Sequence, residues 1–209
     1  MSTIRIVGGV WRRTSLAVPD RPGLRPTPDR VRETLFNWLG QDLSGWRVLD
    51  AFAGSGALGL EAASRGAGRV LMVESDRAAT QAIARLLERL RASSDPACRA
   101  AAAAVELRRD DIRRVLPALA AAGERFDLAM LDPPFGQDWL ARILPLLAPV
   151  LEDGARVYVE SGEAVDAGAL SATLPPGAGK LQSLKLGRAG QVHYHLLEYR
   201  QTHPPDPRT

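Results

Sequence analysis

The chain contains very little cysteine or histidine. Cys98 is the only cysteine among 209 residues, which excludes an internal disulfide and any cluster of cysteine metal ligands. The three histidines, His193, His195 and His203, lie close together near the C-terminus and away from any cluster of carboxylates. We therefore expect no metal site and a reducing compartment.

Long apolar runs are missing as well. No uncharged apolar stretch approaches the roughly twenty residues that a membrane span requires. Residues 1–13 carry Arg5, Arg12 and Arg13 among isolated apolar positions, so they do not resemble a secretory signal. A hydrophobic content of 45% and a charged content of 24% are typical of a globular protein. We expect one cytoplasmic domain with short appendages.

Lysine is scarce, and nearly all of the 27 basic residues are arginines. Residues 1–40 contain seven arginines against three acids, so this segment has a local charge of +4 in a chain of net charge +3. Arginine forks neutralise phosphates and release counterions, which indicates a nucleic-acid-binding segment. Solvated surface arginines explain the same composition equally well.

The N-terminal segment of the chain is expected to form an appended arm. Up to about residue 24, its glycines and prolines favour turns and short strands. Thr27-Pro28-Asp29 then supplies a cap residue, a proline for the first helical turn and an acid at the positive helix end. These three residues predict a helix over about 28–39.

Short apolar runs then alternate with longer amphipathic ones, which predicts strand-helix repeats around a parallel sheet. We expect strands at 46–51, 69–74, 104–108, 127–131 and 155–160, and helices at about 57–65, 77–91, 111–121 and 138–150. Residues 93–96 predict a turn, and no role is assignable to residues 100–104. Residues 181–186 and 192–199 flank a turn-like break and predict an antiparallel hairpin, and the tail over 202–209 is expected to fray.

A glycine-rich turn follows the first strand of this alternation. Gly54, Gly56 and Gly59 match the spaced glycines of dinucleotide-binding turns, where backbone approaches a ligand at a helix N-terminus. Glu74 ends the next strand, where an acid can accept hydrogen bonds from ribose hydroxyls. Asp50 is awkward beside a pyrophosphate but suits a cationic amino group. S-adenosylmethionine is thus favoured over the nicotinamide dinucleotide of a hydride-transfer enzyme, and a tight turn with a surface acid is the structural alternative.

A second site lies at Asp132-Pro133-Pro134-Phe135, after the strand expected at 127–131. The prolines stiffen the loop and leave the carbonyl of Pro133 free to accept a hydrogen bond, and Asp132 can accept another. An exocyclic amine donates two hydrogens, so two fixed acceptors can direct its lone pair toward a methyl donor. Phe135 would stack on an unpaired or flipped base. A rigid loop with a core phenylalanine explains the tetrapeptide in isolation.

Asp110-Asp111-Ile112 follows the third strand, where an acid can receive the amine of an adenine. Asp111 is the better candidate because Ile112 would pack under the adenine. A helix N-cap explains the same residues.

Together these segments resemble the class I S-adenosylmethionine-dependent methyltransferases. Within that class they resemble the bacterial 16S ribosomal RNA guanine-N(2)-methyltransferases of the RsmD type. The segments that carry the resemblance are residues 5–12, 23–38, 49–62 and 132–135.

The resemblance extends to about Tyr199 and implies a Rossmann-like α/β fold. It implies a seven-stranded, mostly parallel sheet with a C-terminal antiparallel hairpin and a short N-terminal extension. We accordingly expect an RNA-binding arm and helix over 1–40, a methyltransferase domain over 41–200 and a flexible tail over 201–209. The implied reaction is methylation of guanine 966 of 16S ribosomal RNA at its N2 amine. The implied partner is the small ribosomal subunit or its assembly intermediate, with no membrane and no obligate protein partner.

Three groups of residues receive roles through the resemblance. The S-adenosylmethionine-binding residues are Asp50, Phe52, Gly54, Gly56, Glu74 and Asp111. The catalytic residues at the target base are Asp132, Pro133 and Phe135. The residues facing RNA are Arg5, Trp11, Arg12, Arg13, Arg25, Arg30 and Arg32.

The expected mechanism is direct in-line transfer to the guanine amine without a metal or a covalent enzyme intermediate. The amine becomes strongly acidic once alkylated, so its proton can pass to Asp132 or water afterwards. Two rival functions use the same residues differently: an adenine-specific DNA methyltransferase, and a non-catalytic RNA-binding assembly factor that retains the fold. The intact set of Asp50, Glu74 and Asp132 is evidence against the second.

Overall fold

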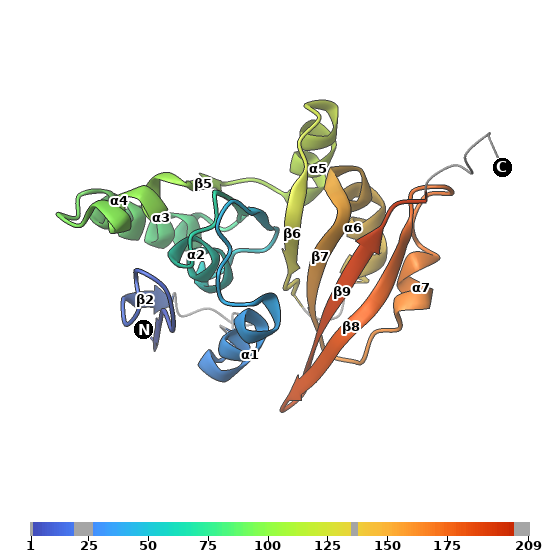
Figure 1. Cartoon of the computed structure of the whole chain (residues 1–209), viewed down its shortest axis with the longest axis horizontal. Helices are drawn as coiled ribbons and strands as arrows, with labels where there is room; N and C mark the ends of the chain where they lie inside the picture. Colours follow the sequence, from blue (N-terminus) through green and yellow to red (C-terminus); the bar gives the residue numbers. More distant parts are fainter. Residues whose placement is uncertain (1, 19–26, 135–137, 203–209) are drawn as a thin grey trace.

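A seven-stranded sheet forms the centre of the computed structural model, which describes residues 2–18, 27–134 and 138–202 (Figure 1). Its strand order is β5-β4-β3-β6-β7-β9-β8. The first five strands in this order are parallel, and β9 runs antiparallel to both β7 and β8. The expected mostly parallel sheet with a C-terminal hairpin is confirmed. Its strands are β3 (Arg47–Asp50), β4 (Arg69–Val73), β5 (Val105–Arg108), β6 (Phe126–Leu131), β7 (Leu151–Ser161), β8 (Lys180–Ala189) and β9 (Val192–Arg200).

Helices cover both faces of this sheet. They are α1 (Asp29–Leu39), α2 (Ala57–Ser64), α3 (Arg77–Arg91), α4 (Pro96–Ala103), α5 (Ile112–Ala121), α6 (Trp139–Leu147) with the short 3-10 helix η1 (Ala148–Val150), and α7 (Ala167–Ser171). In the described part of the chain, no helix combines the length and apolarity needed to cross a lipid bilayer.

Side chains alternate between two apolar cores along the central strands. Val48 and Met130 belong to the core shared with α1 to α4, whereas their neighbours Leu49 and Ala129 belong to the core shared with α5, α6 and α7. Successive strand residues point to opposite faces, so burial on both faces requires a continuous apolar run. The short runs in the sequence therefore mark β3, β4 and β6.

The N-terminal arm packs into the first of these cores. Strands β1 (Ser2–Arg5) and β2 (Ser15–Val18) pair as a separate antiparallel hairpin beside α2, α3 and α4 (Figure 1). Trp11 is 2% exposed, and its indole N–H lies 3.3 Å from the carbonyl oxygen and 3.1 Å from Sγ of Cys98. Cys98 belongs to α4, so this helix forms part of the surface on which the arm packs.

The sequence missed two helices and merged two elements. Asp95 caps α4 by accepting a hydrogen bond from the amide of Ala97. Residues 100–104, to which the sequence assigned no role, form the second half of this helix and its C-cap. The helix expected over 138–150 divides into α6 and η1, and Pro149 lies inside η1. Helix α7 has only five residues, too few for a recognisable period.

Candidate functional site

A cavity of about 1360 Å³ opens at the carboxyl ends of the parallel strands. Strand β3 lies between β4 and β6, so the chain crosses over in opposite directions on its two sides. Ligands of open α/β sheets bind at such a switch point. The walls come from the residues after β3, β4, β5, β6 and β7, together with Thr27 and the tip of the β8–β9 hairpin at residues 188–192.

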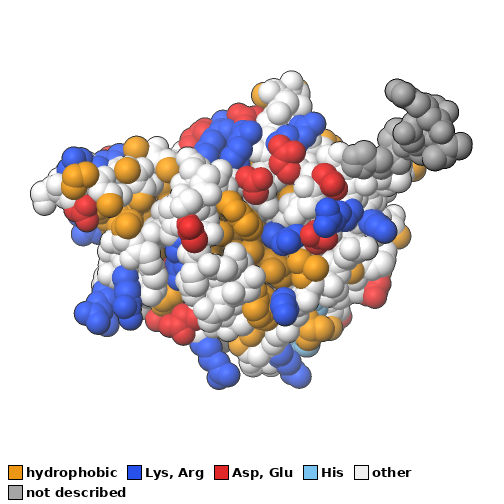
Figure 2. Space-filling view, in the orientation of Figure 1, with side chains coloured by type: hydrophobic (Ala, Val, Ile, Leu, Met, Phe, Trp, Pro, Cys, Tyr) orange, Lys and Arg blue, Asp and Glu red, His pale blue; other side chains and the backbone are white. Residues whose placement is uncertain are grey.

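The cavity is strongly acidic. Among the described residues, its lining contains one basic residue, Arg188, against six acids: Glu74, Asp76, Asp110, Asp111, Asp132 and Glu160. In Figure 2, apolar side chains gather in the middle of the face in view, and both acidic and basic side chains lie around them. Such a lining repels a pyrophosphate and attracts a ligand with cationic groups.

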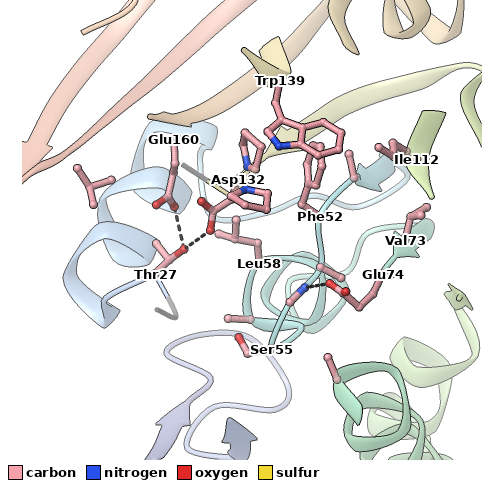
Figure 3. A pocket seen from close by; sticks show the side chains of 18 of the residues that line it. Thr27, Phe52, Ser55, Leu58, Val73, Glu74, Ile112, Asp132, Trp139 and Glu160 are labelled. Carbon is pink, nitrogen blue, oxygen red and sulfur yellow. Dashed lines mark hydrogen bonds between the residues drawn. The ribbon is translucent and has the colours of Figure 1, made fainter. Parts of the chain in front are cut away.

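The glycine turn after β3 forms one wall. Gly54 and Gly56 have positive φ angles of 53° and 82°, which glycine adopts without strain. The Gly54 amide donates a 2.7 Å hydrogen bond to Oε2 of Glu74, and the Asp76 amide donates one of 2.7 Å to Oε1 (Figure 3). A carboxylate has about four lone-pair positions, so Glu74 can still accept from the hydroxyls of a ligand. The sequence-predicted ribose site therefore has suitable geometry.

Asp50 lies behind this wall rather than in it. It is 1% exposed, its Oδ2 accepts a 2.9 Å hydrogen bond from the Gly59 amide, and it is not among the lining residues. A Cβ at Gly59 would lie 2.9 Å from the same oxygen, so glycine is required here for close approach. Burial raises the pKa of Asp50 to about 7, and the hydrogen bond from Gly59 opposes this rise. Asp50 thus fixes the N-terminal turn of α2 under the ligand.

Asp111 lines the cavity and also caps α5. Its side chain accepts from the Arg113 amide at 2.9 Å and forms an ion pair with the Arg113 guanidinium. The Arg113 guanidinium lowers the pKa of Asp111. The N-cap explanation is therefore correct for this residue, and Arg113 donates to both carboxylate oxygens, so an adenine amine would have to share them with Arg113. Ile112 lies beside it in the wall, near Val73 (Figure 3).

Asp132 faces the opposite part of the cavity. Its Oδ2 lies 3.4 Å from the hydroxyl of Thr27, which donates a shorter 2.8 Å hydrogen bond to Oε1 of Glu160 (Figure 3). Burial raises the pKa of Asp132 well above its ordinary value, and the charges of Glu160 and Asp50 raise it further. None of the hydrogen bonds among the described residues uses the carbonyl of Pro133.

Thr27 has a different role from the one expected. The N-cap of α1 is Pro28, and no side chain caps it. The Thr27 hydroxyl instead bridges the carboxylates of Asp132 and Glu160.

Sequence reasoning also missed Glu160 and Trp139. Glu160 follows the buried residues 157–159 of β7 and lies one residue before the end of that strand. Glu74 and Asp132 directly follow their strands, so an acid at the carboxyl end of a strand was the available signal. Trp139 packs edge-on against the predicted cofactor residue Phe52, with ring centroids 5.5 Å apart. Its buried indole nitrogen has no hydrogen-bond partner among the described residues.

The residues expected to face RNA separate into two groups. Arg5, Arg12, Arg13 and Arg30 are exposed, consistent with that expectation. Trp11 is a core residue, as described above, so its assignment to an RNA surface is not supported. Arg25 and the proposed base-stacking residue Phe135 lie outside the described residues.

Arg32 is also buried, with no exposed side-chain surface. It donates to the carbonyl oxygens of Thr27 and Arg5 and forms ion pairs with Asp29 at 2.9 Å and Glu61 at 3.3 Å. A guanidinium has five N–H donors in a rigid fork, which suits it to join several segments. Arg32 therefore holds the arm, the start of α1 and helix α2 together, and the expectation that it faces RNA is corrected.

Within residues 2–18, 27–134 and 138–202, no group of three or more histidine, cysteine, aspartate or glutamate side chains is arranged to hold a metal ion.

Comparison with known proteins places this geometry in a family. The model of the family described as Conserved hypothetical protein 95 matches residues 4–198. Ribosomal RNA small subunit methyltransferase D of Escherichia coli K12 is 42% identical over 199 residues, covering 93% of this chain and 89% of the relative. The protein of the same name from Haemophilus influenzae is 36% identical over 160 residues, covering 76% of this chain and 78% of the relative.

A solved structure extends the agreement to three dimensions. The protein yhhF of Escherichia coli, described as a methyltransferase, superposes with a TM-score of 0.74 at 35% identity and covers 95% of this chain and 99% of its own. The chain belongs to the family of ribosomal RNA small subunit methyltransferase D.

Proposed function

We propose that this protein transfers a methyl group from S-adenosylmethionine to the N2 amine of guanine 966 in 16S ribosomal RNA. The observation that carries the proposal is the cavity at the switch point of the sheet, whose described lining residues include six acids and one arginine. S-adenosylmethionine has a sulfonium and an ammonium group and no phosphate, so its charges complement this lining. The volume of about 1360 Å³ exceeds the ~300–1,000 Å³ of common small-molecule sites and suits a cofactor with a flipped base.

The wall around the glycine turn provides the cofactor site. Glu74 would accept from the ribose hydroxyls and Asp111 from the adenine amine, while Gly54, Gly56 and Phe52 would lie against the amino acid portion. Asp50 would support this region through the amide of Gly59. When bound, the cofactor supplies an electrophilic methyl group.

Asp132 and the carbonyl of Pro133 would hold the target amine. They accept hydrogen bonds from its two N–H groups and turn its lone pair toward the methyl group, which is positioning and electrostatic catalysis. Once the amine is alkylated, its proton passes to Asp132 or to water. The target base has to leave its stack to reach this loop.

The substrate is proposed to be the small ribosomal subunit or its assembly intermediate. Exposed Arg12 and Arg13 on the arm would contact phosphates. Replacing both with Gln is expected to weaken binding to the particle several-fold and to lower the salt slope by about two. Equal affinity and an unchanged slope would exclude these arginines from the interface.

Mass spectrometry of small-subunit RNA from a deletion strain tests the function directly. The proposal predicts loss of one N2-methylguanine and its return when the gene is restored. Tritium transfer to RNA and DNA substrates separates the rivals: an adenine-specific DNA enzyme would label DNA, and a non-catalytic assembly factor would label neither.

A further inference from the structure

The geometry points to Glu160 as the residue that selects guanine, by accepting the N1–H of the target base beside the amine held by Asp132. This inference rests on the proposed function and deepens it. The Asp-Pro-Pro-Phe tetrapeptide can hold the amine of adenine or of guanine, so it leaves the choice of base open. Glu160 lies where that choice can be made.

The sheet places the two carboxylates side by side. Leu131, the last residue of β6, pairs with Val159 of β7 in parallel register, and the residues that follow them in the chain are Asp132 and Glu160. The hydroxyl of Thr27 lies between them, 2.8 Å from Oε1 of Glu160 and 3.4 Å from Oδ2 of Asp132. Both residues line the cavity (Figure 3).

One oxygen of each carboxylate remains available. The hydroxyls of Thr27 and Tyr158 both donate to Oε1 of Glu160, each at 2.8 Å, and orient the carboxylate. The hydrogen bonds formed by the described residues involve neither Oε2 of Glu160 nor Oδ1 of Asp132. The site therefore offers two adjacent acceptors to a ligand.

Two adjacent acceptors match guanine and not adenine. The Watson–Crick edge of guanine presents the N1–H beside the N2 amine, so it has neighbouring donors. Adenine presents an acceptor at N1 beside its N6 amine, and a carboxylate at the position of Glu160 would face that lone pair. Charge-assisted hydrogen bonds to the guanine edge would therefore favour guanine, whereas adenine would leave Oε2 of Glu160 without a donor.

A purely structural role accounts poorly for an acid at this position. Glu160 is 3% exposed, and the guanidinium of the nearby Arg32 donates to Thr27, Arg5, Asp29 and Glu61 instead of to Glu160. A buried carboxylate without a directly bonded cation is costly, whereas a glutamine could accept from Thr27 and Tyr158 at a smaller cost. Such unfavourable placement is characteristic of functional sites.

The test compares two bases that share the 2-amine. Small-subunit particles are reconstituted with 16S RNA that carries either guanine or 2-aminopurine at the target position, since 2-aminopurine has a lone pair at N1. The measured quantity is the ratio of kcat/KM for guanine to kcat/KM for 2-aminopurine. The wild-type protein is expected to prefer guanine by about 100-fold, the value of a charge-assisted hydrogen bond.

In Glu160→Gln, the amide keeps an acceptor for Thr27 and Tyr158 and can donate to N1 of 2-aminopurine. The guanine preference is expected to fall at least tenfold, and the exposed control Glu163→Gln is expected to leave it unchanged. An equal fall of kcat/KM on both bases in Glu160→Gln would show a structural role and overturn the inference. A guanine to 2-aminopurine ratio near one in the wild-type protein would overturn it as well. If the wild-type protein methylates neither particle, the proposed function fails first.

Discussion

The two halves of the cavity satisfy their carboxylates in different ways. Around the glycine turn, Glu74 and Asp111 accept hydrogen bonds from backbone amides, and Asp111 also pairs with Arg113. At the ends of β6 and β7, Asp132 and Glu160 accept only from the hydroxyls of the described residues. Burial raises the pKa of both, and for Glu160 the hydrogen bonds from Thr27 and Tyr158 and the charge of Arg32 oppose this rise. Backbone amides thus orient the carboxylates of the first half, whereas in the second half Oδ1 of Asp132 and Oε2 of Glu160 accept no hydrogen bond from the described residues.

The largest test of this difference is Asp132→Ala. Removing an acceptor of the target amine is expected to lower kcat by about 10²–10⁴-fold, a typical loss for a positioned catalytic group. Affinity for S-adenosylmethionine, measured by calorimetry, is expected to change less than about threefold, because Asp132 lies in the other half. Unchanged methylation rates would remove Asp132 from the mechanism, and a parallel loss of cofactor affinity would mean that the halves are not separate.

Arg32→Met tests how the second half is supported. Loss of the buried guanidinium breaks its links to Thr27, Arg5 and Glu61, so the free energy of unfolding is expected to fall by about 3 kcal/mol. Denaturant unfolding measures this change, with exposed Arg30→Met as the control expected to remain within about 0.5 kcal/mol of wild type. Equal stability of the two variants would contradict the assigned linking role. Since Arg32 holds Thr27, the KM for RNA is expected to rise more than the Kd for the cofactor.

Glu74→Ala is the matched change in the first half. It leaves the amides of Gly54 and Asp76 without this acceptor and removes the proposed ribose contact. The Kd for S-adenosylmethionine is expected to rise by about 30-fold, or roughly 2 kcal/mol, with kcat at saturating cofactor nearly unchanged. Glu74→Gln retains an acceptor and is expected to recover part of the affinity. An unchanged Kd in both variants would exclude Glu74 from the cofactor site.

The smallest effect concerns the pH dependence of stability. A carboxyl group whose pKa is raised on folding stabilises the protein at low pH, and this contribution is lost as the pH rises through the raised value. Above the raised pKa values of Asp132 and Glu160 the two carboxylates repel each other, so Asp132→Asn is expected to raise the free energy of unfolding by about 1 kcal/mol at alkaline pH. The gain is expected to decrease as the pH falls toward the ordinary carboxyl range, where both groups are protonated.

Thermal or denaturant unfolding at several pH values measures this gain. Exposed Glu163→Gln is the control and is expected to show no such trend. A gain of the same size at every pH would mean that repulsion between the two carboxylates is not its cause.

Much of the fold followed from periodicity alone. Helices α1, α2, α3 and α5 begin and end within about one residue of their predicted limits. Helices α1, α3 and α5 have a clear apolar period, whereas α2 is buried along its whole length and was located by the glycine turn before it. Helix α4 was not predicted because its alanine-rich sequence has only a weak apolar periodicity, although its Asp95-Pro96 start is a standard N-terminal signal. The short hairpin tip beside the cavity could not be placed, since its position depends on contacts such as that between Trp38 and Tyr194.

For the site, the sequence determined the chemistry of individual strand ends: glycines for close approach at Gly54 and Gly56, and acceptors at Glu74 and Asp132. These predictions depend only on neighbours along the chain. Tertiary structure decided which distant residues meet, because the register of β6 with β7 and the path of Arg32 depend on packing between segments. Packing buries Trp11 and Arg32, which were expected to face RNA, and places the Thr27 hydroxyl between the carboxylates of Asp132 and Glu160. It also placed Glu160 beside Asp132, where a single strand-ending acid becomes one of a pair of acceptors.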